Sequence, residues 1–320
     1  MGLFSYLRPQ EMIDPGGRQV VREKPYEKYS FSNLVSREDQ GQQFEKIEDL
    51  PGGEGYRSFV FQYFSEGKKI TGQLNEPLGG GVRPAVILLR GYVDPEVYYT
   101  GLGTKNAAAY YAKRGFVTIA PDFLGYGGSD EEEENSLGAR VVKLASVLDL
   151  VGIVTNLDGV DEANIFLWGH SNGGQIGISA LEVLDERARR QGSERVFRAA
   201  TLWAPVTKPF PYSILYYTDE SDDGGKALRQ ALAVFEREYD VFDYSIDRYW
   251  DWITTPIVVH QGTADEAVPS EWSRDFAADL KDRQKEVELY IYPGANHNLT
   301  PGWDLVVERD LVFFQSYMTR

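Results

Sequence analysis

The 320-residue sequence lacks cysteine altogether and contains only three histidines. The absence of thiols excludes disulfides, a cysteine nucleophile and cysteine-ligated zinc sites. Chemistry that depends on an imidazole must therefore use His170, His260 or His297. With so few candidates, a catalytic base can be sought by elimination.

Long hydrophobic runs and an excess of basic residues are also missing. No stretch of roughly 18 consecutive apolar residues occurs, so we expect no membrane span. The 33 lysines and arginines are outnumbered by 49 aspartates and glutamates, which gives a formal net charge of −16. A surface of this sign repels phosphate backbones, and we do not expect nucleic acid as a partner.

The first residues, MGLFSYLRPQ, lack the basic-then-apolar layout of a signal peptide. We therefore expect a cytoplasmic location, and a secreted protein only if a signal peptide has been removed. The composition leaves the oligomeric state open.

Short apolar runs alternate with helical segments over most of the chain, which predicts an α/β fold with a mostly parallel sheet and helices on both faces. The runs typical of strands buried on both faces are 84–90, 116–121, 164–169, 199–204, 256–261 and 287–292. Helices are expected at about 104–114, 137–155, 173–188, 270–284 and 302–318. Two earlier segments, 57–64 and 69–76, alternate in hydrophobicity and predict N-terminal antiparallel strands.

Two segments depart from this alternation. Residues 1–50 are polar and interrupted by proline and glycine, which predicts an irregular N-terminal arm, or short helices, wrapped around the domain. Residues 206–252 are rich in aromatics and too long for a structureless loop, so we expect a small helical cap inserted after the sixth strand. The core domain then comprises residues 51–205 and 253–320.

The stretch LWGHSNGGQ places Ser171 between an expected strand and an expected helix. This is the context of a nucleophile elbow, in which a serine sits on a strained turn and needs small neighbours such as Gly169 and Gly173. The following helix directs free N–H groups at an oxyanion that forms there. Ser171 is therefore the candidate nucleophile.

A serine nucleophile needs a base, and the base needs an orienting carboxylate. His170 is adjacent to Ser171 and should point away, whereas His260 lies within an expected core strand. His297 follows the last strand in a loop at the carboxyl edge of the sheet, where such folds place their sites. It is the candidate base.

For the acid, Asp265 lies in the loop HQGTADEAVPS after another core strand. It could instead cap a turn or the next helix, and Glu266 is the alternative acid. The order Ser171, Asp265, His297 is nevertheless that of the α/β-hydrolases. For the oxyanion hole, we expect the backbone amides of Asn172 and Tyr92, the latter in the loop after strand 84–90.

Together, RPAVILLRGY, APDFLGYGGSD, WGHSNGGQ, HQGTADEAVP and YPGANHN resemble the α/β-hydrolase superfamily over residues 57–318. The resemblance is to prolyl oligopeptidase catalytic domains and dienelactone-hydrolase-like esterases. It implies a serine hydrolase that uses neither metal nor cofactor, with the triad and oxyanion residues named above. Arg90-Gly91 replaces the His-Gly of many relatives, and a guanidinium can supply the loop support that histidine gives there.

We expect a carboxylesterase that acts on small or medium esters, with feruloyl- or acetyl-esterase-like activity as candidates. A serine peptidase of the prolyl oligopeptidase type, which would act on short peptides, is the alternative. The arm of about 50 residues is too short for the propeller that covers the site in those peptidases, which favours the esterase. A non-catalytic hydrolase-fold protein that binds a small ligand is the minor alternative.

The aromatic residues of the cap offer a further hint about substrate. Those predicted to wall an acyl or alcohol pocket are Tyr212, Tyr216, Tyr217 and Trp250. The competing interpretation is that these rings form the core of the cap and dock it onto the sheet, because small subdomains need such anchors.

Overall fold

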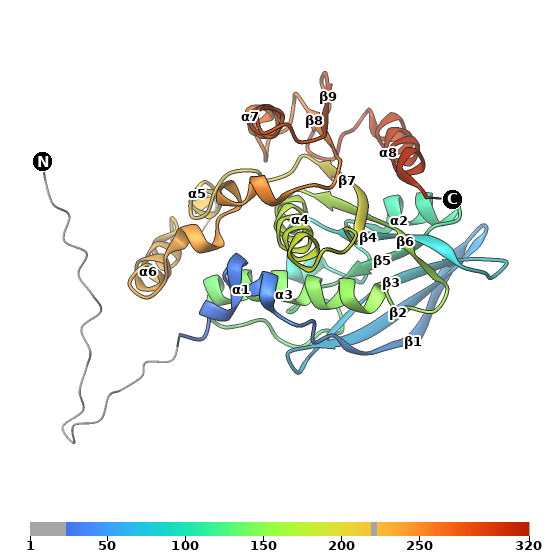
Figure 1. Cartoon of the computed structure of the whole chain (residues 1–320), viewed down its shortest axis with the longest axis horizontal. Coiled ribbons are helices and arrows are strands. Elements are labelled where there is room, and N and C mark those ends of the chain that lie inside the picture. The colour runs from blue at the N-terminus through green and yellow to red at the C-terminus, as the bar shows by residue number, and fades with distance from the viewer. Residues whose placement is uncertain (1–23, 219–222, 320) are drawn as a thin grey trace, which may run out of the picture.

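A nine-stranded mixed sheet forms the centre of the molecule (Figure 1). The computed structural model describes residues 24–218 and 223–319. The strands lie in the order β1-β2-β3-β5-β4-β6-β7-β8-β9. Their bounds are β1 Gln42–Gly53, β2 Tyr56–Ser65, β3 Lys68–Pro77, β4 Arg83–Leu89, β5 Val117–Pro121, β6 Val160–His170, β7 Phe197–Trp203, β8 Ile257–Gly262 and β9 Val287–Tyr292.

The sheet combines an antiparallel N-terminal part with a parallel remainder, which confirms the predicted fold class. Strands β1, β2 and β3 pair antiparallel, and β3 pairs antiparallel with β5. The other neighbours, from β5 and β4 through β9, pair parallel. Their carboxyl ends therefore meet at one edge, where loops from different parts of the chain come together.

Strand β1 corrects the expectation that the first 50 residues are irregular, because residues 42–53 form an edge strand on β2. Most of its residues are exposed, and its register with β2 shifts at three places. Such a strand carries little hydrophobic alternation, which is why the sequence did not reveal it. Counting β1, the insertion follows the seventh strand rather than the sixth.

Helices cover both faces of the sheet (Figure 1). The longer ones are α2 Lys105–Ala112, α3 Ser136–Val154, α4 Asn172–Gln191, α7 Ser270–Asp282 and α8 Trp303–Tyr317. In β4, Ile87 and Leu89 pack into the core shared with α3, α4 and α7, while Val86 and Leu88 pack into the core shared with α2 and α8. Burial on both faces follows from the alternating direction of side chains along a strand. Within the described ranges, no helix is long and apolar enough to cross a membrane.

The insertion between β7 and β8 consists of short helices. They are α5 Tyr212–Leu215, α6 Lys226–Phe235 and three 3₁₀ turns, η4 Val241–Tyr244, η5 Ile246–Arg248 and η6 Trp250–Trp252. The ring of Tyr26 packs against that of Phe235 at 6.3 Å, and the Tyr244 hydroxyl donates a hydrogen bond to the Tyr26 carbonyl at 3.0 Å. The N-terminal segment thus contacts the insertion directly.

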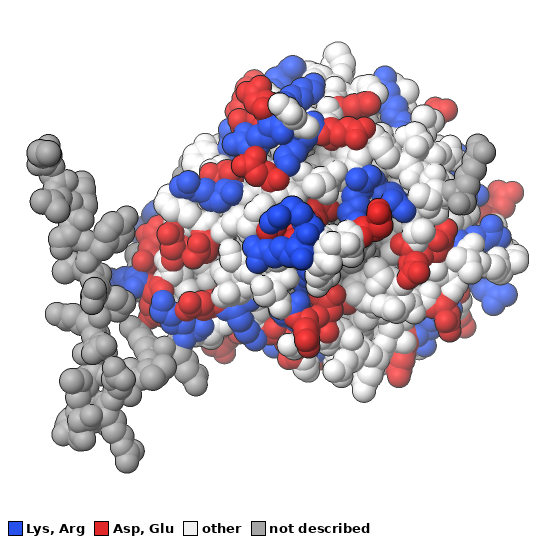
Figure 2. All heavy atoms as spheres, in the orientation of Figure 1, with Lys and Arg blue, Asp and Glu red and all other residues white. Residues whose placement is uncertain are grey.

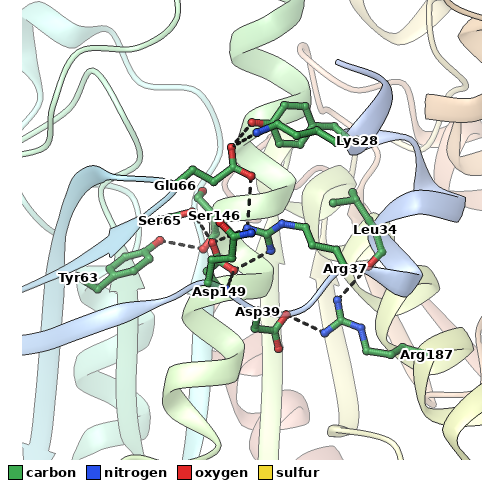
Figure 3. A network of polar contacts seen from close by, with 12 residues as sticks. Lys28, Leu34, Arg37, Asp39, Tyr63, Ser65, Glu66, Ser146, Asp149 and Arg187 are labelled. Carbon is green, nitrogen blue, oxygen red and sulfur yellow. Dashed lines mark hydrogen bonds and ion pairs between the residues drawn. The ribbon is translucent and has the colours of Figure 1, made fainter. Parts of the chain in front are cut away.

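The N-terminal segment, with η1 Glu27–Tyr29 and α1 Phe31–Ser36, is fastened to the core by ion pairs and hydrogen bonds (Figure 3). Arg37 donates two hydrogen bonds, at 2.7 and 2.8 Å, to the fully buried Asp149 of α3. Asp149 also accepts from the Gln40 amide at 2.7 Å and the Ser65 hydroxyl at 2.6 Å. Because a buried carboxylate needs such partners, the network fixes this segment beside α3 and α4.

Candidate active site

Ser171 lies between the end of β6 and the start of α4, with φ 56° and ψ −122°. This region of backbone space is unfavourable for a residue with a side chain and is held by surrounding contacts. The Ser171 amide donates to the Trp203 carbonyl at 2.9 Å, and its carbonyl accepts from the amides of Gly174 at 3.0 Å and Val206 at 3.1 Å. Hydrogen bonds from β7 and α4 therefore hold the strained turn.

The glycines of the elbow are required by close backbone packing. A Cβ at position 173 would lie 2.0 Å from the Leu89 carbonyl oxygen, and one at position 169 would lie 2.9 Å from the Gly173 carbonyl oxygen. Neither contact is possible for a side chain. The two glycines allow α4 to start directly against the end of β4, so the loop after β4 passes beside Ser171.

Asp265 and His297 are joined across two loops. The Nδ1 atom of His297 lies 3.0 and 2.9 Å from the two carboxylate oxygens of Asp265. Asp265 also accepts hydrogen bonds from the Val268 amide and the Gln261 side chain, both at 2.8 Å. Glu266, the alternative acid, is exposed. The structure thus pairs His297 with the predicted acid.

The carboxyl of Asp265 is held in its charged form. Burial by itself raises its pKa, but hydrogen bonds from His297, Val268 and Gln261 outweigh this effect and keep the pKa below its usual value. A charged Asp265 holds the Nδ1–H tautomer of His297, which leaves Nε2 free to accept a proton.

The other two histidines have different surroundings. The Nε2 of His170 lies 3.0 Å from the His297 carbonyl oxygen, and the two rings are 4.7 Å apart. Burial and the neighbouring His297 lower the pKa of His170 to about 4, so it is neutral at pH 7. His260 is fully buried, with Nδ1 2.7 Å from the Tyr292 hydroxyl and Nε2 2.9 Å from Asp310 Oδ1. This confirms the interpretation of His260 as a core histidine.

The loop after β4 brings the backbone next to Tyr92, one of the two predicted oxyanion residues, close to the elbow. A Cβ at Gly91 would lie 2.9 Å from the Ser171 Cβ, so the backbone just before Tyr92 touches the nucleophile turn. The Tyr92 side chain is 73% exposed, and Asn172 is the first residue of α4. The two predicted donors therefore come from segments that flank Ser171 on either side.

The Arg90 side chain supports the loop after β4. Its guanidinium donates to the Gly91 carbonyl at 2.9 Å and to the Asp122 carbonyl at 2.6 Å, and it lies 3.9 Å from the centre of the Tyr126 ring. The fully buried Asp122 carboxylate accepts hydrogen bonds from neighbouring hydroxyls, including that of Tyr98 at 2.6 Å. The Arg90 guanidinium thus holds the loop after β4 in place through these hydrogen bonds.

A cavity of about 200 Å³ adjoins the elbow. Four sets of residues contribute: Tyr29 and Phe31 from the N-terminal segment; Ser136, Ala139, Arg140, Val141, Lys143 and Leu144 from α3, with Glu132 before it; Asn172, Gln175, Ile176 and Ser179 from α4; and Phe210, Ser213, Tyr244 and Ile246 from the insertion. The residues of α4 share one helical face with Asn172 and could have been found from their spacing. The others depend on how distant segments pack.

None of the four aromatic residues predicted to line a pocket borders this cavity. The rings of Tyr212, Tyr216 and Tyr217 lie 6.1, 4.7 and 6.4 Å from that of Trp272 in α7. Trp250 packs against Phe276 with the rings 5.6 Å apart. These contacts dock the insertion onto α7, and a role for these residues in a substrate pocket stays a prediction.

No group of three or more His, Asp or Glu side chains among the described residues is arranged to hold a metal ion. The elbow itself carries the Ser171 hydroxyl, and the Asp265–His297 pair comes near it where the His297 carbonyl lies 3.0 Å from Nε2 of His170. These are suited to nucleophilic attack on a carbonyl and to proton transfer.

The sheet topology and the serine at its nucleophile turn define a serine hydrolase with the α/β-hydrolase fold. Residues 103–318 match the sequence model of the prolyl oligopeptidase family, Peptidase_S9. The chain belongs to this family.

Three individual proteins show the range of similarity. The chain is 25% identical, over 73% of its length and 80% of the relative, to a probable 2-oxo-3-(5-oxofuran-2-ylidene)propanoate lactonase of Bradyrhizobium sp.. It is 22% identical, over 80% of its length and 91% of the relative, to the uncharacterized peptidase YtmA of Bacillus subtilis (strain 168). The structure of acetyl xylan esterase 1 from Thermoanaerobacterium sp. JW/SL YS485 matches with a TM-score of 0.63 at 17% identity, over 92% of this chain and 94% of that one.

Proposed function

We propose that the protein hydrolyses carboxylic esters through an acyl-enzyme on Ser171. The observation that carries this proposal is the Asp265–His297 pair, whose histidine carbonyl lies 3.0 Å from Nε2 of His170, the residue just before the serine held at φ 56°. A hydroxyl on such a turn, next to a base with an ionised orienting partner, is the arrangement that activates serine.

In the proposed mechanism, Ser171 Oγ attacks the ester carbonyl while His297 Nε2 takes its proton. The amides of Tyr92 and Asn172 stabilise the tetrahedral oxyanion. His297 then protonates the alkoxide, the alcohol leaves, and Ser171 carries the acyl group. Water, deprotonated by His297, attacks this acyl-enzyme to release the carboxylic acid and restore the serine.

Two features support an ester substrate over a peptide. The cavity beside Asn172 is small, and the N-terminal segment closes it with Tyr29 and Phe31, which suits a compact acyl group. Among the relatives, one is named for a lactone, which is a cyclic ester, and one for acetyl xylan esters. We also propose that residues 206–252 act as a cap over the core domain, because Phe210 and Tyr244 form part of the cavity wall.

The first test is hydrolysis of 4-nitrophenyl acetate by the protein and by Ser171→Ala. We expect the variant to lose at least about 10⁴-fold in kcat, as other serine hydrolases do without their nucleophile. A fluorophosphonate should label Ser171, as mapped by peptide mass spectrometry. Ser193→Ala, an exposed serine beyond α4, is the matched control. Full turnover by Ser171→Ala, or labelling elsewhere, would contradict the mechanism.

A peptidase is the second candidate, favoured by the family and by the relative YtmA. It uses the same three residues, with an amine as the leaving group. Peptide 4-nitroanilides assayed beside nitrophenyl esters separate the two activities. If neither substrate class is turned over and fluorophosphonate does not react, the remaining candidate is a hydrolase-fold protein that binds a ligand.

A further inference from the structure

Arg140 of α3 places a positive charge in the cavity beside Asn172. Its guanidinium donates a hydrogen bond to Gln175 Oε1, and among residues 24–218 and 223–319 it forms no ion pair. Burial lowers the pKa of Arg140 to about 10, so the group is still charged at neutral pH. Arg140 is only partly exposed. A partly buried charge without a counter-ion is unfavourable, and a bound anion would relieve this cost.

Gln175 links this charge to the elbow. It lies four residues after Ser171, and its amide donates to the Ser171 carbonyl at 3.3 Å. Side chains four apart on a helix are about 5–6 Å from each other at Cβ. The Gln175 side-chain NH₂ donates to the Lys208 carbonyl at 3.1 Å, which turns its oxygen toward Arg140. Gln175 therefore links Arg140 to the helix that begins at the elbow.

The other charges that line the cavity cancel each other. Lys143 and Glu132 form an ion pair at 2.7 Å, so Arg140 supplies the net positive charge of the lining. This contrasts with the chain as a whole, whose net charge is −16, and with the outer face in Figure 2, where acidic and basic side chains are interspersed. The cavity is thus a local site of opposite sign in an acidic protein.

Ser213 of the insertion is a second polar group that indicates a ligand site in this cavity. Its side chain lines the same cavity and is 2% exposed. Its hydroxyl has no hydrogen-bond partner within the described part of the chain. Buried hydroxyls are normally paired, so an unpaired one at a cavity indicates a place for a ligand's acceptor atom. A hydroxyl donor and a guanidinium together are suited to a carboxylate.

We propose that this cavity binds the acyl side of esters that carry a second, ionised carboxylate, with Arg140 as the counter-ion and Ser213 as a further donor. The proposal rests on the proposed function, since the ester is cleaved at Ser171. A volume of about 200 Å³ is below the range of about 300–1,000 Å³ of pockets that hold drug-sized ligands. The predicted substrates are therefore monoesters of short dicarboxylic acids.

The test compares 4-nitrophenyl hydrogen adipate with its neutral match, 4-nitrophenyl methyl adipate. We expect the protein to prefer the anionic ester. Arg140→Gln should lower kcat/KM for that ester by about 10- to 100-fold, which is the range for a lost hydrogen bond to a charged group. The same variant should change kcat/KM for the neutral ester by less than about twofold. Arg140→Lys should restore part of the preference. Arg114→Gln removes a positive charge at the end of α2 and should leave kcat/KM unchanged for both esters.

Binding measurements separate this proposal from the proposed function. Calorimetry with monomethyl adipate should show binding to Ser171→Ala, and at least about tenfold weaker binding when Arg140→Gln is added. If neither ester is hydrolysed but this binding difference is found, the esterase proposal fails and the anion site stands. The anion site is overturned if Arg140→Gln affects both esters equally, if the protein shows no preference, or if the binding difference is absent.

Discussion

The molecule contains two histidine–carboxylate pairs that differ in their surroundings. His297 and Asp265 both come from loops at the carboxyl edge of the sheet, and the His297 side chain is 22% exposed. His260 of β8 and Asp310 of α8 are both fully buried. The same two residue types thus form one pair that is partly open to the surface and one that is sealed in the core.

The partners of each carboxylate explain the difference. Asp310 accepts hydrogen bonds from the Tyr111 hydroxyl and the Trp203 indole, each at 2.8 Å, and from the Thr201 hydroxyl. These donors belong to α2 and β7, so Asp310 fastens α8 to two other elements. Asp265 is held mainly by its own loop and by His297. One pair joins secondary structures, whereas the other orients a single ring.

The largest difference between the pairs should appear in catalytic activity when His297 is replaced. His297→Ala should lower kcat/KM for a nitrophenyl ester by about 10⁴- to 10⁶-fold, because the serine loses its base. Its free energy of unfolding should change by less than about 1 kcal/mol, since a partly exposed loop residue is replaced. Steady-state kinetics and urea denaturation measure the two quantities.

The control is Glu266→Gln, which alters the neighbouring exposed carboxylate. Its kcat/KM should stay within about twofold of that of the unchanged protein. A fully active His297→Ala variant would remove the distinction between the two pairs.

The buried pair should respond in the opposite way. Asp310→Ala leaves the buried donors of Tyr111, Trp203 and Thr201 without partners and should lower the free energy of unfolding by about 3–5 kcal/mol. Activity per folded molecule should change little. Urea denaturation combined with active-site titration tests this. A variant of normal stability that has lost turnover would place Asp310 in the chemistry.

A smaller effect concerns His170, which contacts His297 without belonging to either pair. Its pKa is about 4 in the folded protein, below the ordinary value of about 6.5. Between these values the unfolded chain binds a proton that the folded chain does not, so stability should fall as the pH falls from about 6.5 to about 4. The loss attributable to this group is at most about 3.5 kcal/mol, from a shift of about 2.5 pKa units at about 1.4 kcal/mol per unit. The difference in unfolding free energy between the protein and His170→Gln, measured across this range, isolates it. Parallel pH curves for the two proteins would contradict the assignment.

The residues proposed as nucleophile, base and acid could be selected from the sequence because each carries a local signal. Ser171 has glycine neighbours and lies where an apolar run ends and a helix begins. His297 and Asp265 lie in loops that follow apolar runs, and their order along the chain is that of the fold. The parallel sheet then brings these loops to one edge. Such a site can be located without coordinates because the topology itself assembles it.

The cavity was not predictable in this way. Arg140 lies on a helix whose sequence gives no reason to expect a functional arginine, and its position depends on how α3 packs beside α4. Phe31 enters the wall only because the Arg37–Asp149 network fastens the N-terminal segment to the core (Figure 3). The aromatic residues chosen from composition, such as Tyr216, pack instead on Trp272. Composition identifies a segment rich in rings but not the direction in which each ring points.

The sequence by itself therefore determined the class of fold, the elbow and the residues most suited to the chemistry, because hydrophobic periodicity, glycine spacing and chain order are local properties. Only the tertiary structure showed that His260 is paired with Asp310 and that Arg140 lies in the cavity beside the elbow. Those features depend on contacts between segments up to about a hundred residues apart, such as His260 with Asp310 and Arg37 with Asp149. Burial and pairing, which set the behaviour of a charged group, arise only when such segments are packed together.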